Sequence, residues 1–207
     1  IDVVAKPNSL ASDLGIHLFS YKEAIKMAFD KIKQNDVLSS WYDSFTNQFH
    51  SRNVWQYLEV PEKGCFTDFR KMKVDDDELA MERVFSIGGK TGWYYANFLW
   101  KIRGFLDKLM GGVGLRRGRR NQNELEAGDS VDFWRVLFAN KEEKRLLLFA
   151  EMKVPGEAWL EFYIKDGELH QEATFRPLGL SGRLYWYSVL PFHGLIFNGM
   201  LRKLAGK

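Results

Sequence analysis

The C-terminal segment Ser181–Leu204 places the strongest constraint on the fold of this chain. It reads SGRLYWYSVLPFHGLIFNGMLRKL, and 18 residues without a formal charge separate Arg183 from Arg202. A segment this apolar either spans a membrane, which requires about 20 predominantly apolar residues, or forms a helix buried over most of its circumference. The choice depends on whether the rest of the chain supplies an apolar surface for this helix to cover.

The bulk composition is that of a globular protein with one large domain, or one domain with an appendage. The chain has 207 residues, of which 45% are hydrophobic and 28% charged, in the ordinary range for soluble domains. The net charge of +3 is small, and a general nucleic-acid binder would carry more. We therefore expect no nucleic-acid partner.

The aromatic and cysteine content indicates what kind of globular protein this is and where it is located. Seven Trp, eight Tyr and sixteen Phe favour an apolar cavity, because large flat side chains line such pockets. One cysteine, Cys65, cannot form an internal disulfide, and no secretory signal opens the sequence. These features predict a cytoplasmic location, with membrane-surface association as the alternative. Because the first residue is not Met, we expect a piece of a longer polypeptide.

The N-terminal segment, residues 1–53, contains one predicted helix. Ser20-Tyr21-Lys22-Glu23 is a capping box, and apolar residues follow it at helical spacing to about residue 33. Residues 39–54 are polar and irregular, which indicates a linker. The sequence thus divides into this segment and a second unit, residues 54–207.

The second unit begins with two predicted strands, Gln56–Val60 and Cys65–Val74, and an acidic run, Asp75–Glu78. Four adjacent carboxylates cannot all converge on one ion, so we interpret the run as a helix N-terminus rather than a metal site. The helix should extend to Ile87, and Trp93–Met110 should form the next.

Two motifs suggest anion binding without establishing it. Gly88-Gly89-Lys90-Thr91-Gly92 has part of a phosphate loop, but it lacks the required earlier glycine and follows a helix. We expect it to open the next helix, with weak phosphate contact at the helix N-terminus as the lesser alternative. The second motif consists of four arginines, Arg116, Arg117, Arg119 and Arg120. They could bind phosphate or lipid headgroups, or they could lie in a solvated loop and pair with nearby acidic residues.

Four predicted strands joined by tight turns follow: Val131–Ala139, Lys144–Val154, Glu157–Ile164 and Glu168–Arg176. The turns contain Asn, Pro-Gly and Asp-Gly. Alternation places Leu146, Leu148 and Ala150 on one face with equivalent residues of the neighbouring strands, so the sheet is antiparallel with an apolar face. Such a face must be covered, and Ser181–Leu204 is the only later segment apolar enough. We expect it to be kinked or shifted near Pro191.

The opposite, polar face supports two interpretations. Glu151 and Glu161 could perform acid–base chemistry there. Alternatively, they form a cross-strand charge ladder with Arg135 and Lys153, which the spacing favours.

Several long segments resemble an uncharacterised domain found at the C-terminus of NmrA-like atypical short-chain dehydrogenase proteins. They are GKTGWYYANFLWKIRGFLDKLMGGVGLRRGRR, DFWRV, AEMKVPGEAWLEF and LYWYSVLPFHGLIFNGM, and the resemblance covers residues 55–205. It implies an α+β, START/Bet v 1-like (SRPBCC-type) helix-grip fold, with a curved antiparallel sheet wrapped around the C-terminal helix. Proteins of that fold bind lipids, polyketides and other hydrophobic molecules.

Residues 15–45, with Tyr21-Lys22-Glu23-Ala24, resemble the end of the dehydrogenase portion. The resemblance therefore implies an N-terminal NAD(P)-binding domain in the same polypeptide, of oxidoreductase or epimerase type. No Rossmann glycine loop occurs in this chain, so we assign it no cofactor.

The leading functional hypothesis is a module that binds a hydrophobic small molecule or lipid. Its predicted lining is Trp134, Met152, Leu160, Phe162, Phe175, Tyr187, Phe192 and His193, although each has core packing as an alternative. The second hypothesis is an enzyme of cyclase or isomerase type, for which His193 is the candidate acid–base residue.

Two further hypotheses concern surfaces rather than cavities. Leu184–Leu201 could insert into a membrane with Arg116–Arg120 at the headgroups, or the unit could dock or dimerise the dehydrogenase. Four scattered histidines and one cysteine provide no zinc motif, so no metal site is predicted.

Overall fold

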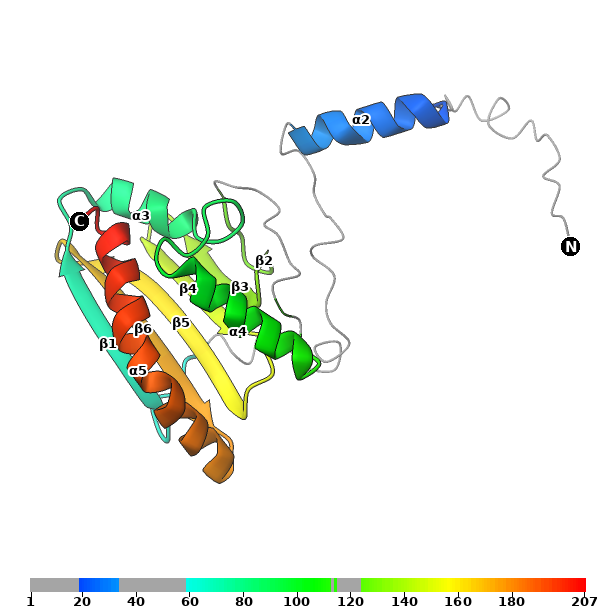
Figure 1. Ribbon diagram of the computed structural model, residues 1–207. Helices are drawn as coiled ribbons and strands as arrows, with labels where there is room; N and C mark the ends of the chain where they lie inside the picture. Colours follow the sequence, from blue (N-terminus) through cyan, green and yellow to red (C-terminus); the bar gives the residue numbers. More distant parts are fainter. Residues whose placement is uncertain (1–18, 34–58, 113, 115–123) are drawn as a thin grey trace, which may run out of the picture. The chain divides into compact units, whose positions relative to one another are not determined.

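The computed structural model describes residues 19–33, 59–112, 114 and 124–207 (Figure 1). The chain divides into two compact units, Ile1–Leu38 and Ser39–Lys207, which are described separately. The predicted boundary between residues 53 and 54 and the four arginines at 116–120 lie outside the described residues.

The first unit contains helix α2 (Tyr21–Lys33), which begins with the predicted capping box. The Ser20 N–H donates to Glu23 Oε2 at 2.9 Å, and the Glu23 N–H donates to Ser20 Oγ at 3.3 Å. The hydrogen bond with the Ser20 side chain lowers the pKa of Glu23. The reciprocal bonds satisfy two amides that a helix N-terminus leaves unpaired.

The second unit is built on a six-stranded antiparallel sheet. Its order is β1-β6-β5-β4-β3-β2, so the predicted meander β3 to β6 is confirmed and β1 extends it beyond β6. The strands are β1 (Phe66–Lys73), β2 (Ser130–Val131), β3 (Trp134–Asn140), β4 (Arg145–Ala150), β5 (Gly156–Lys165) and β6 (Glu168–Pro177). Glu59 and Val60 do not belong to a strand, so the prediction of a strand at 56–60 fails at its described end.

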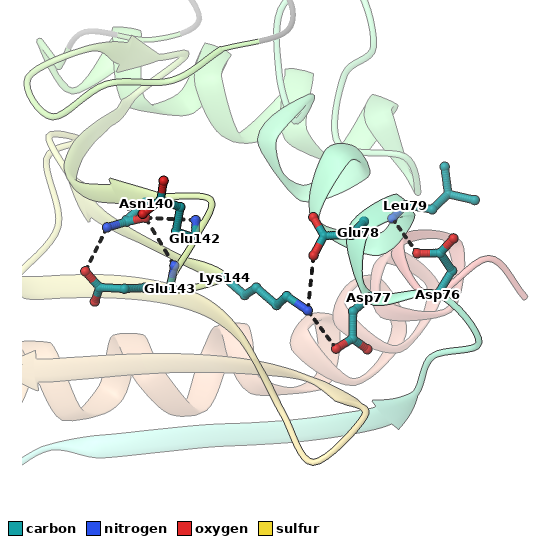
Figure 2. Close-up of polar contacts among 8 residues, drawn as sticks. All are labelled: Asp76, Asp77, Glu78, Leu79, Asn140, Glu142, Glu143 and Lys144. Carbon is teal, nitrogen blue, oxygen red and sulfur yellow. Dashed lines mark hydrogen bonds and ion pairs between the residues drawn. The ribbon is translucent and has the colours of Figure 1, made fainter.

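The tight turns follow the sequence chemistry. Asp166 and Gly167 join β5 to β6 with φ values of 54° and 70°, and positive φ at both central residues is the type I′ requirement of a two-residue hairpin. Between β3 and β4, Asn140 Oδ1 accepts from the N–H groups of Glu142 and Glu143 at 2.9 and 3.1 Å (Figure 2).

Three helices, α3 (Asp77–Phe85), α4 (Asn97–Leu109) and α5 (Gly179–Leu204), pack on one face of this sheet (Figure 1). The core there combines helix residues such as Val84, Trp100 and Met200 with buried strand residues. The predicted apolar row is confirmed, because Leu146, Leu148, Leu160, Phe162 and Leu169 are all fully buried.

Helix α5 covers β1 and β6, so the predicted helix-grip arrangement is confirmed. It runs for 26 residues and continues through Pro191. Within the described parts of the chain, no helix is long and apolar enough to cross a lipid bilayer.

The acidic run forms the N-terminus of α3, as predicted. Asp76 is the N-cap, and its side chain accepts from the Leu79 N–H at 3.0 Å. Lys144 Nζ reaches across to Asp77 at 3.0 Å and to Glu78 at 3.2 Å (Figure 2). These carboxylates therefore serve helix capping and a link between α3 and the β3–β4 turn.

The glycine-rich loop Gly88–Gly92 differs from the prediction. Gly88 and Gly92 exchange backbone hydrogen bonds of 2.8 and 3.1 Å, so the loop closes on itself instead of opening α4. Helix α4 begins only at Asn97, whose Oδ1 accepts from the Trp93 N–H at 2.8 Å. The positive φ values of Tyr94 and Ala96, 60° and 51°, explain why the helix cannot start at Trp93.

The outer face of the sheet is less polar than the alternation suggests. Leu137, Leu147, Phe149 and Trp159 form a second buried cluster there. One predicted ladder pair forms, since Arg135 Nε donates to Glu151 Oε1 at 2.9 Å. Glu161 Oε1 instead accepts from Arg145 Nε at 2.5 Å. The Lys153 N–H donates to Asp107 Oδ1 at 2.7 Å.

The two ion pairs should differ in their contribution to stability. Arg135 and Glu151 are 1% and 0% exposed, whereas Arg145 and Glu161 are 39% and 15% exposed. We expect Glu151→Ala to lower the free energy of unfolding by about 3–5 kcal/mol, because it leaves a buried guanidinium without its carboxylate. Glu161→Ala is the control and should cost less than about 1 kcal/mol. Urea unfolding of both variants measures the difference, and equal losses would contradict this account.

Candidate binding site beneath the C-terminal helix

The inner side of β1 places two charged residues under α5. Alternate residues of a strand share a face, and Phe66, Asp68, Arg70 and Met72 are the partly buried set in the burial pattern of β1. Three of them contact α5: Phe66 stacks on Trp186 at 5.5 Å, and the two charged side chains contact residues farther along the helix. The strand thus brings an ion pair to a face that is otherwise apolar.

Asp68 and Arg70 form a two-point ion pair. Arg70 Nε lies 2.8 Å from Asp68 Oδ1, and Nη2 lies 2.9 Å from Oδ2. The third nitrogen, Nη1, donates to Asn198 Oδ1 on α5 at 2.5 Å. Because a guanidinium presents its donors in a rigid plane, this arrangement fixes Arg70 between the strand and the helix.

His193 of α5 lies beside this pair. Its Nδ1 is 3.7 Å from Asp68 Oδ2, which is too long for a hydrogen bond, and this buried atom has no hydrogen-bond partner. The imidazole stacks on Phe197 at 4.5 Å and meets Trp186 edge-on at 5.2 Å. Burial lowers the pKa of His193 and the Asp68 carboxylate opposes that shift, so the ring is neutral at pH 7.

Gln171 completes the group from the neighbouring strand. It pairs in register with Arg70 on β1 and with Phe162 on β5, so its side chain belongs to the same inner face. Gln171 is 0% exposed, and neither its Nε2 nor its Oε1 has a hydrogen-bond partner. Buried polar atoms in native proteins are nearly always paired, so this amide calls for an explanation.

We call Asp68, Arg70, Gln171, His193 and Asn198 the sub-helix cluster. It combines the ion-paired Arg70 guanidinium, an unpaired buried amide and a neutral imidazole that contacts the rings of Trp186 and Phe197. Such a set can bind the polar group of an otherwise apolar molecule. It has no metal character, because no three His, Cys, Asp or Glu residues of the described ranges are placed to hold an ion.

An open groove of about 620 Å³ adjoins the cluster at Asn198. Its lining consists of Met72, Tyr95, Gly194, Leu195, Asn198, Gly199, Arg202, Lys203 and Lys207. The Tyr95 ring packs directly on Gly199, where an added Cβ would lie 2.3 Å from the ring, so only glycine fits there. The groove combines apolar walls with basic residues from the last turn of α5.

The residues predicted to line a ligand pocket differ in how far they are buried. Trp134, Leu160, Phe162 and Phe175 are buried, with 5% exposure or less. Met152 is half-buried, and its Sδ lies 2.8 Å from Arg103 Nη2. Tyr187 and Phe192 are 60% and 53% exposed, and the Tyr187 ring meets Phe66 of β1 edge-on at 5.6 Å.

Of the sub-helix cluster, the sequence predicted only His193 as a site residue, and the other four residues were not predicted. Gln171 interrupts the apolar row of Leu169, Ala173 and Phe175, and a polar residue in such a row is a detectable signal. Asp68 and Arg70 likewise interrupt the row formed by Phe66 and Met72 on the partly buried side of β1. Asn198 gives no such signal, because its role depends on where Arg70 lies.

The stability of the fold should depend on pH through His193. Because the folded-state pKa of His193 is lowered, the unfolded chain binds this proton first as the pH falls below about 6.5. Stability is therefore retained above that value and lost as the pH falls. We expect His193→Gln to lose less stability than the native protein between pH 7.5 and 5.5. Urea unfolding at both pH values tests this, and an identical loss in the two proteins would contradict it.

Comparisons with known proteins place the chain in a family. The crystal structure of Ara h 8.0201 superimposes with a TM-score of 0.35 and 10% identity, over 70% of this chain and 100% of that chain. The probable translation initiation factor IF-2 of Pyrococcus abyssi (strain GE5 / Orsay) is 29% identical over 125 residues, which are 51% of this chain and 13% of that protein. The chain therefore spans about one eighth of that relative. A family model matches residues 62–200, and the chain belongs to that family, described as protein of unknown function (DUF2867).

Proposed function

We propose that this chain binds a hydrophobic small molecule or lipid that carries a hydrogen-bonding group, held between α5 and the sheet. The observation that carries the proposal is the Gln171 amide, fully buried on the inner face with both polar atoms unpaired. An unpaired buried amide costs roughly 1–3 kcal/mol. A bound polar group would remove that cost.

The surroundings of Gln171 define the chemistry of the ligand. An apolar wall lies four residues farther along the same two strands, where the Trp186 ring stacks on Phe66 and Phe175 with centroids 5.5 and 5.9 Å away. Arg70 and Gln171 lie opposite each other in register, so a carboxylate, carbonyl or hydroxyl group of the ligand would meet a cation and an amide together. Asn198 connects this position with the open groove, which is where the ligand would enter.

Native mass spectrometry of the purified protein tests the proposal directly. We expect a bound species that organic extraction releases, and saturable binding of the amphiphilic fluorophore 8-anilinonaphthalene-1-sulfonate at one site. A protein that carries no extractable molecule and binds no fluorophore would refute the proposal.

Gln171→Met should separate ligand binding from folding. The variant removes an unpaired buried amide at nearly constant volume, so we expect the unfolding free energy of the ligand-free protein to rise by about 1–3 kcal/mol. Binding of the fluorophore should fall at the same time. Calorimetry and fluorescence titration measure the two effects.

Leu169→Met is the matched control, on the same strand and face. It conserves volume and apolar character, so stability should change by less than about 1.5 kcal/mol and binding should persist. Loss of binding in both variants, or destabilisation by Gln171→Met, would count against the assignment.

A second candidate function is catalysis by His193 on a hydrophobic substrate. The neutral imidazole beside the Asp68 carboxylate, 3.7 Å away, favours this candidate, because a general base must be unprotonated at working pH. If turnover of a cyclisation or isomerisation substrate is found, His193→Ala should abolish it. Turnover unchanged by that substitution would exclude His193 as the base.

We also propose that an NAD(P)-binding, dehydrogenase-like domain precedes this unit in the full polypeptide and that α2 packs against it. The resemblance of residues 15–45 supports this, as do the exposed apolar side chains of α2, with Tyr21 83% and Met27 44% exposed. In the full-length polypeptide, hydrogen exchange at the α2 amides should be slow. Exchange as fast as in an unfolded peptide would oppose the proposal.

A further inference from the structure

Helix α4 exposes an apolar stripe to solvent. Phe98, Ile102, Phe105 and Leu109 are spaced by four, three and four residues, which places them along one side of a helix. Each is more than half exposed, and Leu109 reaches 68%. The opposite side of α4 is already satisfied, because Trp100, Gly104 and Asp107 are buried. The stripe therefore contributes nothing to the core of this unit.

Helix α5 has an exposed apolar stripe as well. Its members are Leu180, Leu184, Tyr187, Pro191 and Leu195, all exposed, with the spacing of one helix face. The two helices lie on the same face of the sheet (Figure 1). Arg103 of α4 joins them, since its Nη2 donates to Tyr185 Oη of α5 at 2.9 Å.

The exposed charged residues of these two helices are all basic. Helix α5 contains no Asp or Glu, and the acid of α4, Asp107, is fully buried and accepts from the N–H groups of Gly114 and Lys153 at 2.8 and 2.7 Å. The exposed charged residues of the two helices are Lys101, Lys108, Arg183, Arg202 and Lys203. Apolar and basic residues on the same helical surfaces are the combination that anionic lipid bilayers attract.

The charge of this surface favours an anionic lipid bilayer over a second copy of the chain as its partner. Aligned exposed apolar residues with basic neighbours are typical of an interaction surface. A second copy of the chain would bring like charges together across the contact, which disfavours association. A bilayer with anionic headgroups instead accepts both the apolar stripes and the lysines.

We propose that the outer sides of α4 and α5 form a docking surface for an anionic lipid bilayer. The apolar stripes enter the boundary between headgroups and acyl chains, and the basic residues contact the headgroups. This inference does not depend on ligand binding at the sub-helix cluster, although Leu195, Arg202 and Lys203 also line the groove at Asn198.

Vesicle flotation with the 207-residue protein tests the proposal. The probes are vesicles of phosphatidylcholine alone and of phosphatidylcholine with 30 mol% phosphatidylglycerol. We expect the protein to float with the anionic vesicles, not with the neutral ones, and binding to weaken at 0.5 M NaCl because salt screens exposed charges. Equal binding to both vesicles, or binding to neither, would overturn the proposal.

Charge variants locate the surface. Lys101→Glu with Lys108→Glu should lower partitioning to anionic vesicles by at least about 30-fold, since each basic residue near the membrane contributes about a factor of five. The matched control is Lys73→Glu with Lys165→Glu, exposed residues of β1 and β5 that change the net charge equally. A control that loses as much binding as the test pair would show that net charge alone acts, and would overturn the assignment to α4.

Phe105→Ser with Leu109→Ser tests the apolar part. Both side chains are exposed, so thermal unfolding should be unchanged while vesicle binding is lost. If these substitutions dissolve a dimer seen by analytical ultracentrifugation and leave vesicle binding intact, a second copy is the partner and the proposal fails. Gln171→Met should leave vesicle binding unchanged, so a failure here is distinguishable from failure of the ligand proposal.

Discussion

The packing of α5 against the inner sides of β1 and β6 is the interaction on which the rest of this structure depends. The inner face of the sheet is apolar, and Phe197, Met200 and Leu201 of α5 are buried against the same core. Burial of such side chains contributes roughly 1.5–3 kcal/mol each, so neither surface is stable without the other. The helix also brings His193 and Asn198 to the charged pair on β1, which makes the sub-helix cluster a direct consequence of this packing.

The buried polar groups of the second unit divide into two classes. Asp107 is bonded to backbone amides of two loops, which ties α4 to the connection between β4 and β5, and Arg135 is paired with Glu151. These groups stabilise the fold because their hydrogen bonds offset the cost of leaving water. Gln171 has no such partner. A polar group kept on an apolar face without a structural partner is better explained by function than by stability.

The local elements were largely predictable from the sequence. The capping box before α2, the acidic N-terminus of α3, the meander and the long C-terminal helix all rest on contacts between residues close in sequence or on strict alternation, and all are present. Predictions failed where backbone conformation departs from the regular pattern. Tyr94 and Ala96 delay the start of α4 through positive φ values, and no propensity argument would place a left-handed residue there.

The sequence by itself determined that an apolar sheet face and an apolar helix must meet, because periodicity shows which side chains share a face and apolar faces avoid water. Only the tertiary structure decided which polar residues meet beneath that helix. Asp68, Gln171 and His193 are separated by long stretches of chain, and their proximity follows from strand order and helix position. Likewise, the sequence shows that α4 and α5 are apolar and basic, but the side of each helix that remains exposed is set by what the sheet covers.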